Sequence, residues 1–194
     1  MAEDIDTLEK QNLAPQVYNS ASTIAVDTEV LGALVQELGI APEVATQTSV
    51  LIDDRNHTSY RGSQMPKWLD RKLNGEQDYN AGEGSVVRVS SRFKGKDLAA
   101  EEMNKTLAHE LEHVAQQARG DVGMKVGNGA IWGLAATGAG IGRELAKDRG
   151  LLAKVILPLG MAAVGHQIGY KLAPHERGAR ARAQEITTTA ISRI

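Results

Sequence analysis

Residues 106–113 read Thr-Leu-Ala-His-Glu-Leu-Glu-His and lie within a longer segment, residues 97–118, that has the spacing of an amphipathic helix. In a helix, His109 and His113 stand one turn apart on the same face, so both imidazoles can reach a single metal ion. Glu110 follows the first histidine, at the position from which a carboxylate acts as general base on water at the metal. This stretch therefore predicts a zinc site with hydrolytic chemistry on a helix.

The sequence around this predicted helix supports the same interpretation. Apolar residues cover its other side, at Leu107, Ala108, Leu111, Val114 and Ala115. Asp97 stands where an N-cap is expected, and Gly120 follows the predicted end. Residues 85–90, Ser-Val-Val-Arg-Val-Ser, are rich in β-branched side chains and predict a strand before the helix. Because a zinc peptidase holds an extended substrate along a strand, we expect residues 85–90 to provide that edge.

The composition narrows the possible metal ligands and partners. The 194 residues include no cysteine, which excludes disulfides, cysteine-ligated metal sites and cysteine nucleophiles. Any zinc ion is therefore held by His, Asp or Glu. A formal net charge of −2 and an aromatic content of 4% argue against a nucleic-acid partner. The acidic residues 1–6 lack the basic and apolar regions of a secretory signal, so we expect a cytoplasmic or membrane-associated protein.

A catalytic zinc site needs a third protein ligand in addition to water. The extended pattern H-E-x-x-H-x-x-G-x-x-H is absent, because Gln116 and Arg119 stand at its glycine and last histidine positions. Glu176 is the best candidate for the third ligand. It opens a predicted helix, and Ala179 and Ala183 allow that helix to pack closely beside the histidine-bearing helix. The other downstream carboxylates are less favourably placed: Asp121, Glu144, Asp148 and Glu185.

Three neighbours of Glu176 are further candidates. His175 is the alternative third ligand, or else a hydrogen-bond partner of a ligand or of the substrate. Tyr170 and Arg180 are candidates to stabilise the oxyanion of a tetrahedral intermediate. Structural roles are the alternatives, since an acid at a helix start complements the helix dipole and a run of arginines is commonly a solvated face.

The two ends of the site resemble a known family. His109-Glu110-Leu111-Glu112-His113, then two apolar segments, then Glu176-Arg177-Gly178-Ala179-Arg180 resembles the gluzincin layout of the HtpX-like and CAAX-prenyl-protease zinc peptidases, over roughly residues 85–190. In that family the second motif reads Glu-x-x-x-Asp with Ala before the Asp. Ala179 matches, whereas Arg180 replaces the Asp that orients a histidine ligand. The continuation Val114-Ala115-Gln116-Gln117 is also similar to small bacterial domains that read His-Glu-Leu-x-His-Val-x-Gln-Gln.

Two apolar segments, residues 130–142 and 151–170, predict a hairpin of helices connected by the charged residues 143–149. The second segment approaches the roughly 20 residues of a membrane span, with Lys154 and His166 near its ends. The first is shorter and rich in glycine, which allows close helix packing in lipid or in a protein core. Membrane contact and a buried core that supports the site are both open interpretations.

The remaining segments give a coarse secondary structure. Residues 28–38 predict a helix, and residues 50–52 predict a short buried strand. Residues 55–84 are polar and predict a long loop that Trp68 anchors, with a short helix near residues 67–72.

We therefore expect a mostly helical α+β fold. A polar N-terminal arm, residues 1–25, precedes a zincin-like minimal metallopeptidase domain, residues 26–194, with a small sheet, an active-site helix and the apolar hairpin at about residues 128–170. The resemblances imply one zinc ion and a peptide or protein substrate. The expected function is that of a zinc-dependent endopeptidase in which Glu110 activates water. The alternative is a non-catalytic metallopeptidase-like scaffold or a membrane-associated interaction protein that contacts lipid through residues 128–170.

Overall fold

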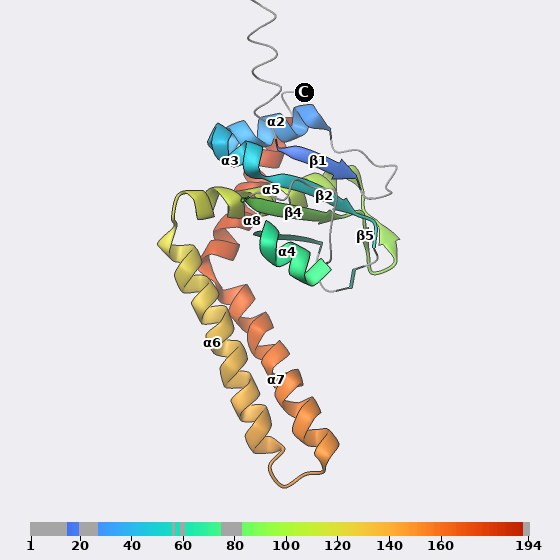
Figure 1. Ribbon diagram of the computed structural model, residues 1–194, viewed down its shortest axis with the longest axis vertical. Coiled ribbons are helices and arrows are strands. Elements are labelled where there is room, and N and C mark those ends of the chain that lie inside the picture. The colour runs from blue at the N-terminus through green and yellow to red at the C-terminus, as the bar shows by residue number, and fades with distance from the viewer. Residues whose placement is uncertain (1–14, 20–26, 56, 59–60, 75–82, 192–194) are drawn as a thin grey trace, which may run out of the picture. The chain divides into compact units, whose positions relative to one another are not determined.

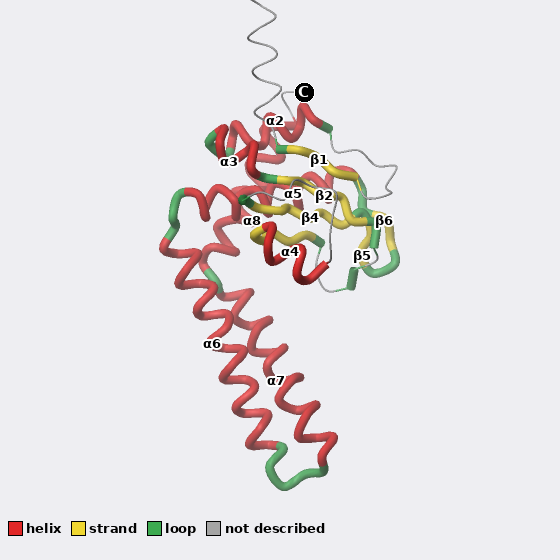
Figure 2. Tube along the Cα trace, viewed as in Figure 1, coloured by secondary structure: helices red, strands yellow, loops and turns green. Residues whose placement is uncertain are grey.

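The computed structural model describes most of the chain in two compact units (Figure 1). The described residues are 15–19, 27–55, 57–58, 61–74 and 83–191. The first unit contains the described residues in the ranges 1–119 and 181–194, and the second unit contains residues 120–180. Helices make up most of the described chain and strands form a small sheet (Figure 2), as the α+β prediction required.

A four-stranded mixed sheet forms the centre of the first unit. Its strand order is β1 (Gln16–Asn19), β2 (Ser49–Asp53), β4 (Ser85–Ser90) and β3 (Gly62–Pro66). The first three strands run parallel, and β3 runs antiparallel to β4 at the edge. The strands predicted at residues 50–52 and 85–90 are thus confirmed.

The prediction that residues 85–90 offer a free edge to a substrate is wrong. Strand β4 pairs along its length with β2 on one side and with β3 on the other. All six of its residues are buried, the three valines as well as Ser85, Arg88 and Ser90, because both faces of the strand are covered. Strand β3 occupies the edge instead, within the residues predicted to form a long loop.

Apolar side chains bury one face of the sheet under helices. Val50, Ile52, Val87 and Val89 share a core with α2 (Thr28–Glu37) and α5 (Ala100–Ala118), to which Ala183 and Ile186 of α8 (Pro174–Ile191) also belong. The helix predicted at residues 28–38 is confirmed, and Gly39 follows it with φ +62°, a left-handed conformation that ends a helix. The face of α5 that packs in this core fixes how the helix presents its histidines.

The other face of the sheet carries α4 (Lys67–Asn74) through buried charges. Arg88 of β4 donates two hydrogen bonds to the carboxylate of Asp70 in α4, at 2.5 and 2.8 Å, and both residues are buried. The prediction of Trp68 as the anchor is wrong, because its side chain is 67% exposed. A bidentate Arg–carboxylate pair holds this helix instead.

Asp53, at the end of β2, extends this network. Its carboxylate accepts hydrogen bonds from Arg55 and lies 3.1 Å from Nε2 of His57 and 3.6 Å from Arg88. Burial by itself raises the pKa of Asp53, but the hydrogen bonds from Arg55 and His57 outweigh it and lower that pKa from 3.8 to about 2. The carboxylate is therefore charged throughout the physiological range.

Several element boundaries differ from the predictions. Helix α5 begins at Ala100 after Ala99, and Asp97 belongs to β6 (Lys96–Asp97), which pairs with β5 (Arg92–Phe93). Asp97 is therefore not the N-cap. Within the segment predicted as an arm, β1 joins the sheet, whereas residues 1–14 and 20–25 lie outside the described residues. A short helix that the sequence analysis did not predict, α3, spans Pro42–Gln47.

The second unit is built on a helical hairpin of α6 (Val122–Leu145) and α7 (Leu151–Leu172). The first helix was predicted to start at residue 130. It starts eight residues earlier, because Val122–Gly129 is also helical. A Cβ atom added at any of four glycines would collide with the backbone of the opposite helix: Gly138, Gly142, Gly165 and Gly169. The two backbones therefore touch directly, which only glycine permits. Among the described residues, α7 is the helix that is long and apolar enough to cross a membrane.

Candidate metal centre

Helix α5 positions the two histidines of the H-E-x-x-H sequence. Leu107, Ala108 and Leu111 are buried in the core of the first unit, so the rotation of the helix about its axis is fixed. His109 and His113 consequently project from the same side, with ring centroids 4.7 Å apart and ring planes 76° apart. His113 is buried and His109 is half-buried. Both side chains can thus donate a ring nitrogen to one ion.

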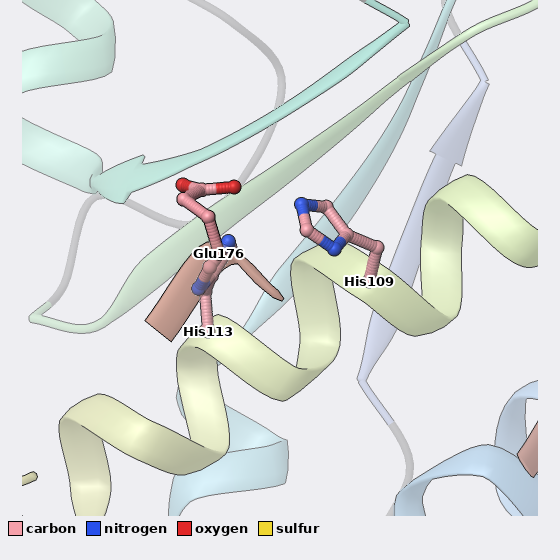
Figure 3. Close-up of side chains that lie close together, drawn as sticks. All are labelled: His109, His113 and Glu176. Carbon is pink, nitrogen blue, oxygen red and sulfur yellow. The ribbon is translucent and has the colours of Figure 1, made fainter. Parts of the chain in front are cut away.

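Glu176 completes this group from helix α8. The ring nitrogens of His109 and His113 and a carboxylate oxygen of Glu176 all lie within 4.8 Å of one another (Figure 3). Residues further along the same helix, Ala183 and Ile186, belong to the core that also holds α5. Glu176 lies two turns before Ala183 in a continuous helix, so the packing of α8 carries its carboxylate toward the histidines.

The donor set suits zinc. Zinc binds imidazole nitrogen at about 2.0–2.1 Å and carboxylate oxygen at about 2.0–2.2 Å, which puts tetrahedral ligand atoms about 3.4 Å apart. Ligand atoms up to 4.8 Å apart reach that spacing when they approach by at most about 1.4 Å, within the range of small side-chain rotations. Three protein ligands also leave one coordination position for water, as catalytic zinc requires. His109, His113 and Glu176 therefore form a group that can hold a metal ion.

Gln116 contacts one of the candidate ligands, a contact that the sequence did not predict. Its amide oxygen lies 3.2 Å from Nδ1 of His113, and both side chains are buried. In the tautomer that donates Nδ1–H to Gln116, Nε2 is the ring nitrogen whose lone pair can bind a metal. The signal in the sequence was the spacing of three residues, which places both side chains on one helical face.

Glu110 lies buried against the edge strand. A Cβ atom added at Gly62, the first residue of β3, would lie 3.0 Å from Cγ of Glu110 and 2.6 Å from Cγ2 of Thr106. The absence of a side chain at residue 62 therefore lets the backbone of β3 pass directly over α5 beside Glu110. Gly62 is a second functional candidate that the sequence analysis missed, because its role depends on a strand predicted as loop.

The other predicted residues cluster on Glu176. Nε2 of His175 lies 3.6 Å from Oε1 of Glu176, and the ring of His175 lies against Gly127. The guanidinium of Arg180 lies 3.9 Å from Oε2 of Glu176 and 5.1 Å above the ring of Tyr170. These contacts surround the candidate ligand with a buried histidine and an arginine. His175 is outside the group of three ligand atoms that could share an ion.

The described part of the chain shows this one grouping of three or more His, Asp or Glu side chains that could share an ion. No protein-family model, no curated protein and no solved structure matches the chain.

Proposed function

We propose that the chain is a zinc-dependent endopeptidase with a zincin-like fold. His109, His113 and Glu176 hold one zinc ion, and Glu110 is the general base. The convergence of a distant carboxylate on the two histidines carries this proposal, because the H-E-x-x-H sequence and the third ligand come from segments more than sixty residues apart. The presence of Glu110 favours an enzyme over a non-catalytic scaffold, which needs no base.

The chain's own residues supply the remaining chemistry. When bound, zinc acts as a Lewis acid that lowers the pKa of water to about 7. Glu110 accepts a proton from the attacking water and delivers it to the nitrogen of the leaving amine. Gln116 holds His113 in the tautomer that binds metal. Arg180 and His175 lie beside the carboxylate of Glu176, and Arg180 or Tyr170 stabilises the oxyanion of the tetrahedral intermediate.

The substrate adds to the sheet along β3. In the described part of the chain β3 pairs with β4 alone, so its other edge has backbone groups to offer to an extended peptide. Gly62 brings this edge beside Glu110, which aligns a bound peptide with the general base. The substrate class is therefore an unfolded or extended segment of a protein.

We also propose that the peptidase is membrane-associated. Helix α7 has 22 residues, is apolar enough to cross a bilayer, and leaves its membrane-length window exposed. A large exposed apolar surface is unfavourable in water and is typical of a membrane or protein contact.

Zinc content and peptide hydrolysis test the proposal on the purified full chain. Wild type is expected to hold one zinc ion per chain. Glu176→Ala is expected to lower zinc affinity more than about 100-fold, since the loss of a ligand exceeds the 10–100-fold effect of a supporting residue. Glu185→Ala is the matched control, because Glu185 is an exposed carboxylate on the same helix that pairs with Arg182.

The base is tested separately from the metal. Glu110→Gln is expected to keep one zinc ion and to lose at least about 100-fold in the hydrolysis of an unfolded protein, the contribution typical of general acid–base catalysis. Unchanged zinc affinity in Glu176→Ala contradicts the ligand set. Unchanged hydrolysis in Glu110→Gln contradicts the mechanism.

A further inference from the structure

The hairpin of α6 and α7 has the properties of a membrane-inserted pair, and we propose that it spans a lipid bilayer. Its charged tip, residues 143–150, lies on one side, and the residues that lead to α5 and α8 lie on the other. The acyl chains of lipid cover its outer surface. This inference rests on the proposed membrane association and makes it specific, but it does not depend on peptidase activity.

The outer surface of the hairpin is largely apolar, and between Lys154 and Lys171 the one exposed polar side chain of α7 is Gln167, one turn before Lys171. Large apolar side chains are exposed on both helices: Trp132, Leu134, Ile141 and Leu145 on α6, and Leu151, Leu152, Val155, Ile156, Leu159, Val164, Ile168 and Leu172 on α7. At 100° per residue, the exposed positions of α7 lie on both flanks and on the back of that helix. An interfacial helix keeps a polar face for water, so this distribution favours a helix surrounded by acyl chains.

The inner surface of the hairpin is made mainly of glycine and alanine, with Ile131 beside Gly169. Gly138 lies against the backbone at Met161, and Gly165 lies against the backbone at Leu134. Helices in water associate through large apolar side chains, whereas helices in lipid gain most from close backbone packing of small residues. The small residues lie between the helices and the large ones face outward, an arrangement suited to lipid.

Polar residues bound the apolar surface at both ends. The tip carries Arg143, Lys147 and Arg149, and Lys154 lies within the first turn of α7. At the other end, Tyr170 and Lys171 close α7. From Lys154 to Lys171 the helix rises about 26 Å, and lysines at the two ends can extend to the headgroups of a bilayer whose apolar core is about 30 Å thick.

The positions of an aromatic side chain and a hydroxyl group also fit a hairpin that spans a bilayer. The ring of Trp132 lies 5.6 Å from the ring of His166, in the half of the hairpin that holds Tyr170. Tryptophan and tyrosine gather where a membrane meets water. Between Asn128 and Arg143 the one polar side chain is Thr137, and its hydroxyl donates to the carbonyl oxygen of Gly133 at 2.9 Å. That bond leaves no hydroxyl proton for lipid to solvate.

Vesicle flotation and tryptophan emission test the contact with lipid. The chain has two tryptophans, and both are exposed, with Trp68 at 67% and Trp132 at 69%. In the Trp68→Phe variant, vesicles of phosphatidylcholine and phosphatidylglycerol are expected to shift the emission of Trp132 to shorter wavelength, and brominated acyl chains are expected to quench it. The Trp132→Phe variant is the matched control, in which the emission of Trp68 stays unchanged.

Thiol labelling tests whether the hairpin spans. The natural chain has no cysteine, so single cysteines report without background. Lys147→Cys places a thiol at the exposed tip, and Asp121→Cys places one at the exposed start of the hairpin. In reconstituted vesicles, a membrane-impermeant maleimide applied from the side of Asp121 is expected to label Asp121→Cys at least tenfold faster than Lys147→Cys. Detergent is expected to abolish the difference.

The outcomes separate the two proposals. Flotation with equal labelling of both cysteines means that the hairpin lies on the surface, which overturns the spanning arrangement and keeps membrane association. If the chain does not float with vesicles and forms a dimer in solution, a second copy covers the apolar surface. That result overturns both the spanning arrangement and membrane association. Neither outcome alters zinc content or hydrolysis, so the peptidase proposal stands or fails on its own measurements.

Discussion

The first unit and the hairpin bury opposite kinds of residue. In the first unit the largest fully buried side chains are aliphatic, such as Leu31, Leu34 and Ile52. In the hairpin, glycines such as Gly138 and Gly165 lie inside, and leucines such as Leu159 lie outside. A chain folds its apolar side chains away from water, so the two regions are suited to different surroundings. This difference supports the proposal that lipid surrounds the hairpin.

Leucine truncation is expected to give the largest contrast between the regions. Leu34→Ala removes a fully buried side chain and is expected to cost about 3 kcal/mol of unfolding free energy, through lost burial and the cavity left behind. Leu159→Ala, at a side chain that is 67% exposed, is expected to change that free energy by less than about 0.5 kcal/mol and to weaken vesicle flotation. Urea unfolding and flotation measure the two effects. A large loss of stability in Leu159→Ala in water means that protein covers this face.

The buried polar groups of the first unit give the next contrast. Gln116→Leu removes the acceptor for Nδ1 of His113 and is expected to lower zinc affinity 10–100-fold. Gln117→Leu is the matched control, because Gln117 is exposed and bonds to Gln64 of β3. Competition with a chelator measures both affinities. Equal affinities in the two variants mean that Gln116 does not orient the ligand.

The charge network around Asp53 makes the first unit sensitive to acid. The folded-state pKa of about 2 lies below the ordinary 3.8, so this carboxylate contributes stability above pH 4 that is lost as the pH falls toward 2. Asp53→Asn is expected to lower stability at pH 7 by about 2 kcal/mol and to flatten the loss between pH 4 and pH 2. Urea unfolding at several pH values measures the unfolding free energy, with Trp68 emission as the signal in a Trp132→Phe background. An unchanged pH profile contradicts the role of Asp53.

The smallest expected effect separates two glycines of one helix. A Cβ added at Gly140 meets open space, so Gly140→Ala is expected to stabilise α6 by up to about 1 kcal/mol through helix propensity. A Cβ added at Gly138 meets the backbone of α7, so Gly138→Ala is expected to destabilise the pair by about 1 kcal/mol. Thermal unfolding by circular dichroism in detergent compares them. Stabilisation by both changes means that the backbones do not touch.

Much of the first unit was predictable where the pattern is local. The helix at α2, the strands β2 and β4 and the helix α5 follow from apolar spacing. The predictions failed where a partner from elsewhere in the chain decides the outcome. Strand β3 has little apolar pattern of its own and exists because it pairs with β4, and Trp68 lost the role of anchor because Arg88 binds Asp70.

The sequence by itself identified the residues of the candidate site. His109, Glu110 and His113 follow from spacing on one helix, and Glu176 follows from its place at the start of another, because a helix fixes which side chains share a face. The tertiary structure alone decided the edge strand, the role of Gln116 and the glycine interior of the hairpin. Strand order and backbone contact between helices depend on packing between distant segments, which no local spacing specifies.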